Sequence, residues 1–318
     1  MSFWTGKRVL VTGGGGFLGR HVVEHLKHTE CASIFIVRQR EYDLTREEQV
    51  IRLYAENPAD VVLHLAGHVG GIGANKARPA DFFYRNLMMN TLTFHHAWKS
   101  GVQKLVAAAA GCGYPEHAPM PLKEESFWDG FPQEESAPYS LAKRMLHIQS
   151  LAYAKQHGFM AVSTIPGNIY GPYDNFDLEN AHVVPALVRK FVEATEEQHE
   201  RLIVWGSGQP TRDFVYAGDV AEGILRAAEV YDRPDIINLS AGQETRIADV
   251  VHVLAEITQF SGEILWDSSR PDGQSRRLFD VSKAKRELGW QARTSLREGL
   301  EKTVAWYRAH RRTARNVG

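Results

Sequence analysis

A run of glycines near the N-terminus is the feature that most restricts how this chain can fold. Gly13, Gly16 and Gly19 follow a short apolar run, residues 9–11, and lead into an amphipathic stretch, residues 18–28. This GxxGxxG spacing suits a strand-to-helix turn that brings the backbone close to a pyrophosphate, and the free N–H groups of the helix start favour its charge. The sequence therefore predicts a dinucleotide site at this turn. The expected contacts are Gly13, Gly16, Phe17, Leu18 and Gly19.

Short apolar runs alternate with amphipathic segments through the first half of the chain. After the first run, buried strands are predicted at residues 34–37, 61–65, 105–109 and 161–165. Continuous apolar strands between helices are typical of a parallel sheet that is covered on both faces. We therefore predict an α/β fold of the Rossmann type, doubly wound, with ligands at the carboxyl ends of the strands.

The pattern changes after residue 165. Residues 166–180 are rich in Gly, Pro, Asn and Asp and are predicted to form a long loop of functional importance. Beyond it we predict helices at residues 183–195, 219–229, 245–259 and 296–308, and a strand at residues 202–204. The expected organisation is a cofactor-binding domain of residues 1–167 with 214–240, and a smaller substrate-binding α/β lobe of residues 168–213 with 241–318.

Charge and composition exclude several classes of protein. The 318 residues include 37 Lys and Arg and 38 Asp and Glu, so the formal net charge of −1 favours neither nucleic acid nor an acidic membrane surface. The two cysteines cannot form a disulfide framework, no apolar run is long enough to span a bilayer, and no signal peptide is evident. We expect a cytoplasmic protein, and no residue cluster suggests a metal site.

The residues after the second predicted strand indicate which dinucleotide binds. Enzymes that use NAD usually carry an acidic residue there, which binds the ribose 2′-hydroxyl. This chain has Arg38 and Arg40 instead, and a guanidinium suits the 2′-phosphate of NADP. The pattern favours NADP over NAD without excluding NAD. Asp43 and Leu44 follow and are expected to flank the adenine.

Tyr139 and Lys143 form a candidate catalytic pair. Their i, i+4 spacing, just after Pro138, places both side chains on one face of a helix. A free tyrosine has a pKa of about 10, and a nearby ammonium favours the phenolate. We therefore expect Lys143 to lower the pKa of Tyr139 toward working pH and to hold the nicotinamide ribose.

Beyond these motifs, most of the chain resembles the GDP-L-fucose synthase family, within the extended short-chain dehydrogenases/reductases. The matching blocks are residues 68–72, 79–82, 112–115, 137–143, 168–176, 182–187, 204–208 and 270–273, with Asn86, Asn90 and Arg212. These enzymes epimerise a GDP-4-keto-6-deoxymannose at two carbons and reduce its ketone. The resemblance implies NADP(H) as the cofactor, a GDP-linked sugar as the substrate, and a homodimer paired through helices of the first domain.

The resemblance also implies roles for individual residues. Tyr139 is expected to give a proton to the ketone oxygen with Lys143 as its partner, while Cys112 and His182 match the pair that moves protons during epimerisation. Thiolate and imidazole are chemically suitable for that work. The cofactor contacts implied are Ala66, Gly67, Lys143, Pro166, Asn168 and His182, and the substrate contacts are Asn168, Lys190, Trp205, Arg212 and Arg270.

Two positions depart from the family pattern. Alignment through Cys112 places Ala110 where the family has a Ser or Thr that helps to polarise the ketone. Losing such a donor costs on the order of 10²–10³ in rate. Gly14 and Gly15 replace a polar pair that includes an arginine in some relatives, which weakens the argument for NADP.

Three alternatives to an epimerase/reductase remain open at this point. One is a nucleotide-sugar epimerase that keeps its cofactor and catalyses no net redox reaction, which Ala110 favours. Another is a C4 reductase without epimerase activity. The third is a cofactor-binding sensor or scaffold, against which the presence of Tyr139, Lys143, Cys112 and His182 argues.

Overall fold

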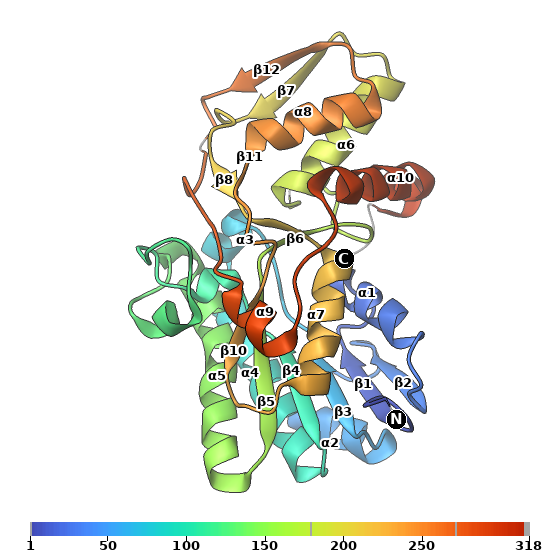
Figure 1. Ribbon diagram of the computed structural model, residues 1–318, viewed down its shortest axis with the longest axis vertical. Helices are drawn as coiled ribbons and strands as arrows, with labels where there is room; N and C mark the ends of the chain where they lie inside the picture. Colours follow the sequence, from blue (N-terminus) through green and yellow to red (C-terminus); the bar gives the residue numbers. More distant parts are fainter. Residues whose placement is uncertain (1, 179, 271, 315–318) are drawn as a thin grey trace.

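The computed structural model describes residues 2–178, 180–270 and 272–314, and a six-stranded sheet forms the core of its larger part, the lower part in Figure 1. Every strand pairing in this sheet is parallel, and the strand order is β10-β5-β4-β3-β1-β2. The strands are β1 (Arg8–Thr12), β2 (Ser33–Val37), β3 (Val61–His64), β4 (Lys104–Ala108), β5 (Met160–Pro166) and β10 (Ile236–Leu239). The first five confirm the predicted runs, and β10 is a strand that the sequence did not reveal.

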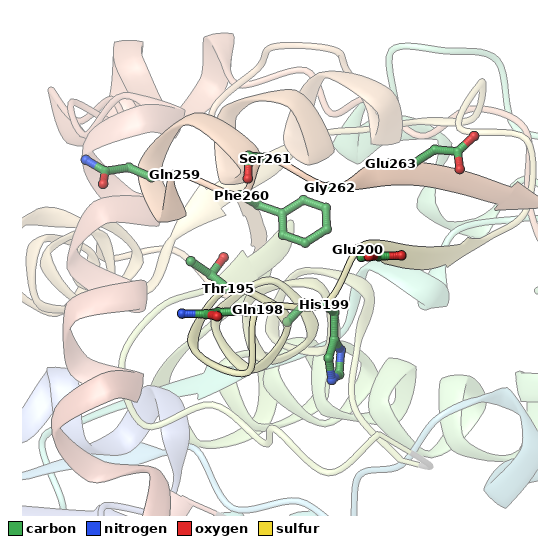
Figure 2. A pocket seen from close by; sticks show the side chains of 10 residues that line it. Thr195, Gln198, His199, Glu200, Gln259, Phe260, Ser261, Gly262 and Glu263 are labelled. Atoms are coloured by element: carbon green, nitrogen blue, oxygen red, sulfur yellow. The ribbon is translucent and has the colours of Figure 1, made fainter.

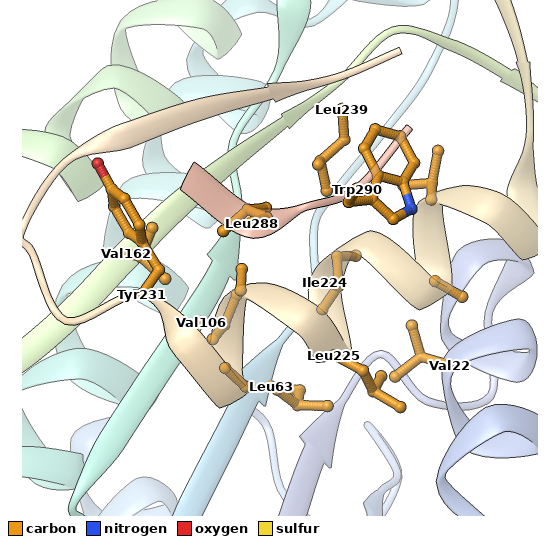
Figure 3. Packing of buried hydrophobic residues seen from close by; sticks show 14 of the residues in the cluster. Val22, Leu63, Val106, Val162, Ile224, Leu225, Tyr231, Leu239, Leu288 and Trp290 are labelled. Atoms are coloured by element: carbon orange, nitrogen blue, oxygen red, sulfur yellow. The ribbon is translucent and has the colours of Figure 1, made fainter. Parts of the chain in front are cut away.

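Helices cover both faces of this sheet, as the apolar strands require. One face carries α1 (Phe17–Leu26), α7 (Ala217–Val230) and α9 (Ser282–Leu288), and the other carries α2 (Glu47–Glu56), α4 (Pro79–Lys99) and α5 (Ala137–His157). Figure 3 shows Leu63 and Val106 of the sheet beneath Ile224 and Leu225 of α7. The doubly wound fold is therefore confirmed.

A smaller group of elements lies beyond the carboxyl ends of the strands (Figure 1). Its own buried core lies among α6, α8, α10 and β7. The bounds are α6 (Val183–Glu196), β7 (Arg201–Trp205), α8 (Ile247–Thr258), β12 (Glu263–Asp267) and α10 (Leu296–Ala314). The predicted helices at 183–195 and 296–308 and the strand at 202–204 lie within these elements. The predicted domain boundaries stay a prediction.

Short strands connect the two parts of the molecule. β6 (Asn168–Tyr170) pairs with β9 (Phe214–Tyr216), and β8 (Thr211–Arg212) pairs with β11 (Thr245–Arg246). The segment 166–180 is thus not loop throughout, because it begins with the end of β5 and includes β6. Likewise α8 begins at Ile247, since the two residues before it are taken up by β11.

The remaining elements lie around the carboxyl ends of β3 and β4 or beside α5. They are α3 (Ile72–Ala77) and the short 3-10 turns η1 (Gly111–Gly113), η2 (Glu124–Trp128) and η3 (Glu134–Ser136). Within residues 2–178, 180–270 and 272–314, no helix combines the length and the apolar character needed to cross a membrane.

Candidate active site

The glycine turn has the backbone geometry that its sequence predicts. Gly13 has a φ of 68°, a left-handed conformation that suits glycine. A Cβ at Gly19 would collide with the carbonyl oxygen of Gly13, so only glycine lets α1 start this close to the turn. Gly16 precedes the first residue of α1, and its N–H donates to the Gly13 carbonyl over 2.9 Å. The turn and the N-terminus of α1 are therefore compact and leave backbone N–H groups at the helix start, the geometry that favours an anionic group.

Arg38, just beyond β2, lies against this turn. A Cβ at Gly15 would overlap the Arg38 guanidinium, so the side chain fills the space that Gly15 leaves open. Asp43 accepts hydrogen bonds from the N–H and the hydroxyl of Thr45, and its carboxylate is thus engaged locally. The side chain of Leu44 is buried in the core beneath α2, which leaves its backbone for any cofactor contact.

A chain of buried polar side chains links β1, the strand before the glycine turn, to α5. His64 of β3 lies 2.7 Å from the hydroxyl of Thr12 through Nδ1 and 3.0 Å from Oδ1 of Asn90 through Nε2. Asn90 then donates to the carbonyl of Ala142 in α5 over 3.1 Å. Burial lowers the pKa of His64 to about 3, so the imidazole is neutral. The sequence marks Asn90 only as part of a family block, and the role of His64 was missed.

Tyr139 and Lys143 lie on the first turns of α5, but their electrostatics differ from the expectation. Lys143 donates to the carbonyls of Ala66 over 3.3 Å and Ala108 over 3.1 Å, at the ends of β3 and β4. Burial, and secondly the charge of Cys112, raise the pKa of Tyr139. The expected lowering by Lys143 is therefore wrong, because burial dominates. Tyr139 keeps its proton at neutral pH, as a proton donor must.

Cys112 lies in η1, which begins shortly after β4, and is half-buried. Burial lowers the pKa values of Lys143, Arg144 and Arg277. The charge of Cys112 acts in the opposite direction on all three and offsets only part of this lowering. Tyr139 and three cations thus lie within electrostatic reach of this thiol. Sequence reasoning missed Arg144 and Arg277. The only local signal was their position, Arg144 next to Lys143 and Arg277 shortly after the family block at 270–273.

His182 directly precedes α6, in a solvent-accessible position at the N-terminal end of that helix. Desolvation by the surrounding protein lowers its pKa, which keeps the imidazole neutral and able to accept a proton. The side chain of His182 forms no capping hydrogen bond with the N-terminus of α6. The predicted pairing of His182 with Cys112 stays a prediction.

The predicted substrate residues of the lobe partly converge on one indole. Trp205, at the end of β7, is 54% exposed, and Lys190 and Arg270 lie 4.8 and 4.9 Å from its ring centre. Lys190 also donates to the carbonyl of Ile203. Arg212 is held by the carbonyl of its neighbour Thr211, and burial lowers its pKa. Lys190 and Arg270 thus place positive charge beside an accessible aromatic ring.

The remaining predicted contacts lie where the strands of the sheet end. Ala66 and Gly67 follow β3 beside Lys143, and Pro166 ends β5. Asn168 opens β6, and its buried Oδ1 atom has no partner within the described residues. Pro271, within the matching block 270–273, lies outside the described residues.

Ala110 ends the segment between β4 and η1 in an extended conformation. Its methyl group offers no hydrogen-bond donor, so the hydroxyl expected from the family is absent at this position. In the described part of the chain, no group of three or more His, Cys, Asp or Glu side chains is arranged to hold a metal ion.

A separate hollow lies in the lobe, between the C-terminal ends of α6 and α8 (Figure 2). Thr195, Gln198, Phe260 and Glu263 are among its lining residues. None of its lining residues is a predicted site residue, and it is open to solvent. The candidate site is instead the region where the strand ends, η1, α5 and the glycine turn come together.

Comparison with known proteins gives consistent relationships. Residues 9–240 match the model of the NAD dependent epimerase/dehydratase family. A probable GDP-L-fucose synthase 1 from Oryza sativa subsp. japonica is 38% identical over 303 residues, which are 95% of this chain and 92% of the relative.

Two solved structures share the fold over nearly the whole chain. A GDP-L-fucose synthetase from Naegleria fowleri bound to NADP has a TM-score of 0.92 at 28% identity, covering 99% of this chain and 96% of the other. A GDP-6-OMe-4-keto-L-xylo-heptose reductase from C. jejuni has a TM-score of 0.88 at 28% identity, covering 97% and 99%. These similarities extend through both the sheet and the lobe.

Proposed function

The chain belongs to the GDP-L-fucose synthase family, within the NAD dependent epimerase/dehydratase enzymes, and we propose that it epimerises and reduces a GDP-linked 4-keto-6-deoxy sugar. At the coarser level it is an NADP(H)-dependent nucleotide-sugar epimerase/reductase of the short-chain dehydrogenase/reductase type. The observation that carries the finer proposal is the gathering of Tyr139, Lys143 and Cys112 beyond the carboxyl ends of β3 and β4.

The residues of the first domain fit the cofactor. The left-handed Gly13 and the close approach at Gly19 leave room for a diphosphate at the N-terminus of α1, and Arg38 lies at its edge. Lys143 uses two of its three N–H groups on backbone carbonyls, which leaves one for a ribose hydroxyl. When bound, NADPH supplies the hydride that reduces the ketone.

Epimerisation requires a base and an acid next to a ketone. A carbonyl acidifies the neighbouring C–H bonds, so a thiolate at Cys112 can remove one proton while the electron pair moves to the ketone oxygen. Return of a proton to the opposite face of the carbon inverts its configuration. His182, neutral and solvent-accessible, is the proposed partner that exchanges this proton.

Reduction requires a proton at the ketone oxygen. Burial holds Tyr139 in its protonated form, and its phenol is the proposed donor. Lys143, anchored to the ends of two strands, keeps a positive charge close to this position at neutral pH. Ala110 stands where the family has a Ser or Thr hydroxyl. We therefore propose that Tyr139 donates the proton without a second hydrogen bond to the ketone from that position.

The lobe supplies the proposed site for the nucleotide. Trp205 offers an accessible indole for packing against a flat base or ring, and Lys190, Arg270 and Arg212 supply positive charge for a diphosphate. Asn168, with its unpartnered amide oxygen, lies between the two parts of the molecule and is proposed to contact both cofactor and substrate.

Self-association through the first domain also stays a proposal. Helices α4 and α5 pack together and leave apolar side chains exposed at Phe83, Tyr84, Ile148 and Leu151. A second copy of the chain would cover this face. Light scattering on the purified protein should give twice the mass of one chain.

One experiment tests the proposed reaction. GDP-4-keto-6-deoxymannose is incubated with NADPH in D₂O, and the product is examined by NMR. Deuterium at carbons three and five together with a reduced carbon four supports the proposal. Reduction without deuterium would instead identify a C4 reductase, a second candidate that the similarity to the heptose reductase favours. Deuterium without consumption of NADPH would identify an epimerase with no net redox reaction, and cofactor binding without turnover would indicate a sensor.

A further inference from the structure

Arg144 of α5 is a buried cation with an unusual set of partners. Its side chain is 3% exposed. The Nε atom donates to the carbonyl of Gly113 in η1, and Nη1 donates to the carbonyl of Gly130 over 2.9 Å. Gly113 directly follows Cys112, so Arg144 ties the catalytic helix to the turn that carries the thiol.

The guanidinium has no carboxylate partner among the described residues. Nη2 is buried without a hydrogen bond, and the rings of Phe127 and Trp128 lie 5.3 and 5.2 Å from the guanidinium carbon. Burying a charge costs several kcal/mol unless a partner compensates. The acidic group whose charge acts on Arg144 is Cys112, which opposes the lowering of its pKa by burial.

The charge of Cys112 also acts on groups of neighbouring elements. These groups are Lys143, on the same helix as Arg144, the phenol of Tyr139, and Arg277. Lys143 is anchored by the strand ends. Arg144 differs from both other cations because it also holds the backbone of the thiol's own turn.

We propose that Arg144 is a positioning residue for Cys112, which fixes the turn η1 and supplies a buried positive charge that favours the thiolate. The inference rests on the proposed role of Cys112 as the base in epimerisation. In that step the C–H bond of the sugar breaks, an S–H bond forms, and the electron pair passes to the ketone oxygen. The charge of Arg144 stabilises the reactant thiolate, and its hydrogen bond keeps the sulfur in place.

The test uses the reactivity of the thiol, which requires no substrate. In a Cys31→Ser background, where Cys112 is the one remaining thiol, the rate of alkylation by iodoacetamide is measured against pH. Loss of a nearby positive charge makes a thiolate harder to form. Arg144→Gln should move the midpoint of this profile upward by about one pH unit. Arg144→Lys keeps the charge and should stay close to the parent midpoint. An unchanged midpoint in folded Arg144→Gln, or an equal shift in both variants, would overturn the proposed role of the charge.

A second pair of variants keeps Arg144 in place, in case its replacement prevents folding. Trp128 is half-exposed and its ring packs on the guanidinium. Trp128→Glu sets a carboxylate beside Arg144 and should raise the alkylation midpoint, whereas Trp128→Gln, its uncharged match, should not. Identical midpoints in these two folded variants would contradict the proposal.

Deuterium exchange separates this inference from the proposed function. If the parent enzyme exchanges sugar hydrogens with D₂O, Arg144→Gln should slow exchange at least tenfold at about pH 7, with partial recovery at higher pH as the thiolate forms. Recovery is the readout that a purely structural defect would not give. If the parent shows no exchange while the alkylation midpoints shift as expected, the epimerase function fails and the effect of Arg144 on the thiol stands.

Discussion

The ammonium of Lys143 donates a 3.1 Å hydrogen bond to the carbonyl of Ala108, the last residue of β4. A second bond, to Ala66, ties the same group to the end of the neighbouring strand. Helix α5, which carries Tyr139, is thereby joined to the carboxyl ends of two neighbouring parallel strands, β3 and β4. This anchoring holds a buried cation at the carboxyl ends of β3 and β4, the side of the sheet on which doubly wound folds bind ligands.

Affinity for NADPH should fall as pH rises through about 8. Burial lowers the pKa of Lys143 to about 8, with the charge of Cys112 opposing the shift, so the ammonium is lost above that pH. Fluorescence titration across this range should show the weakening. Lys143→Arg stays charged, so its affinity for NADPH should depend little on pH. Lys143→Met is never charged at this position, so its affinity for NADPH should be lower than that of the parent and should also depend little on pH. A flat profile in the parent enzyme would contradict the assignment of a titrating Lys143 to the cofactor site.

Tyr139→Phe should abolish ketone reduction and leave cofactor binding almost unchanged. The ring fills the same space, and only the hydroxyl that is proposed to donate the proton is lost. General acid catalysis contributes about 10²–10⁴ in rate. Single-turnover oxidation of NADPH with a confirmed substrate measures the effect, and the dissociation constant of NADPH is the control. Reduction at an undiminished rate would remove Tyr139 from the mechanism.

Arg38→Ala should weaken NADPH by about 10–100-fold and NADH far less, because a charged hydrogen bond to a phosphate contributes about 1.5–3 kcal/mol. Arg38 lies against the glycine turn at Gly15. Arg40 is the matched control, since it is exposed and pairs with Glu41. Arg40→Ala should change either affinity by no more than a few-fold. Equal losses of NADPH and NADH in Arg38→Ala would show that no 2′-phosphate contact exists.

Cys112→Ser should suppress deuterium incorporation at the sugar far more than it slows reduction of an already epimerised ketone. A hydroxyl is a much poorer base than a thiolate. His182→Ala should leave exchange incomplete or release a partly epimerised product. NMR of products formed in D₂O distinguishes the two variants. Full labelling by either one would exclude that residue as a proton carrier.

The free energy of unfolding should fall less steeply with rising pH in Asp174→Asn than in the parent protein. Burial raises the pKa of Asp174 to about 8, while the unfolded carboxyl keeps an ordinary value near 4. Between these values the folded chain holds a proton that the unfolded chain does not, so the free energy of unfolding falls as pH rises, by at most about 1.4 kcal/mol per pH unit. Asn cannot titrate, and it can still accept the bond from the Asn175 N–H. Urea unfolding at about pH 5.5 and about pH 7.5 measures the difference; parallel pH dependences of the parent and the variant would contradict the buried, protonated carboxyl.

Much of the fold followed from local patterns. The glycine turn, the first five strands and the shared helix face of Tyr139 and Lys143 depend on residues within a few positions of each other. Turn chemistry and side-chain periodicity act at that range, so they can be read directly. The strand β10 was missed because it adds to β5 from 70 or so residues further along the chain, and its four residues carry little signal of their own.

The sequence by itself determined the Rossmann-type sheet, the glycine turn and the identity of the candidate acid, Tyr139, since each follows from local spacing and residue type. Only the tertiary structure decided how these groups are tuned. It brought Arg144 and Arg277 to Cys112, set Lys143 on the ends of two strands, and buried Tyr139 enough to raise its pKa rather than lower it. Charges and burial act through space, and the distances that govern them arise only when segments far apart in the chain pack together.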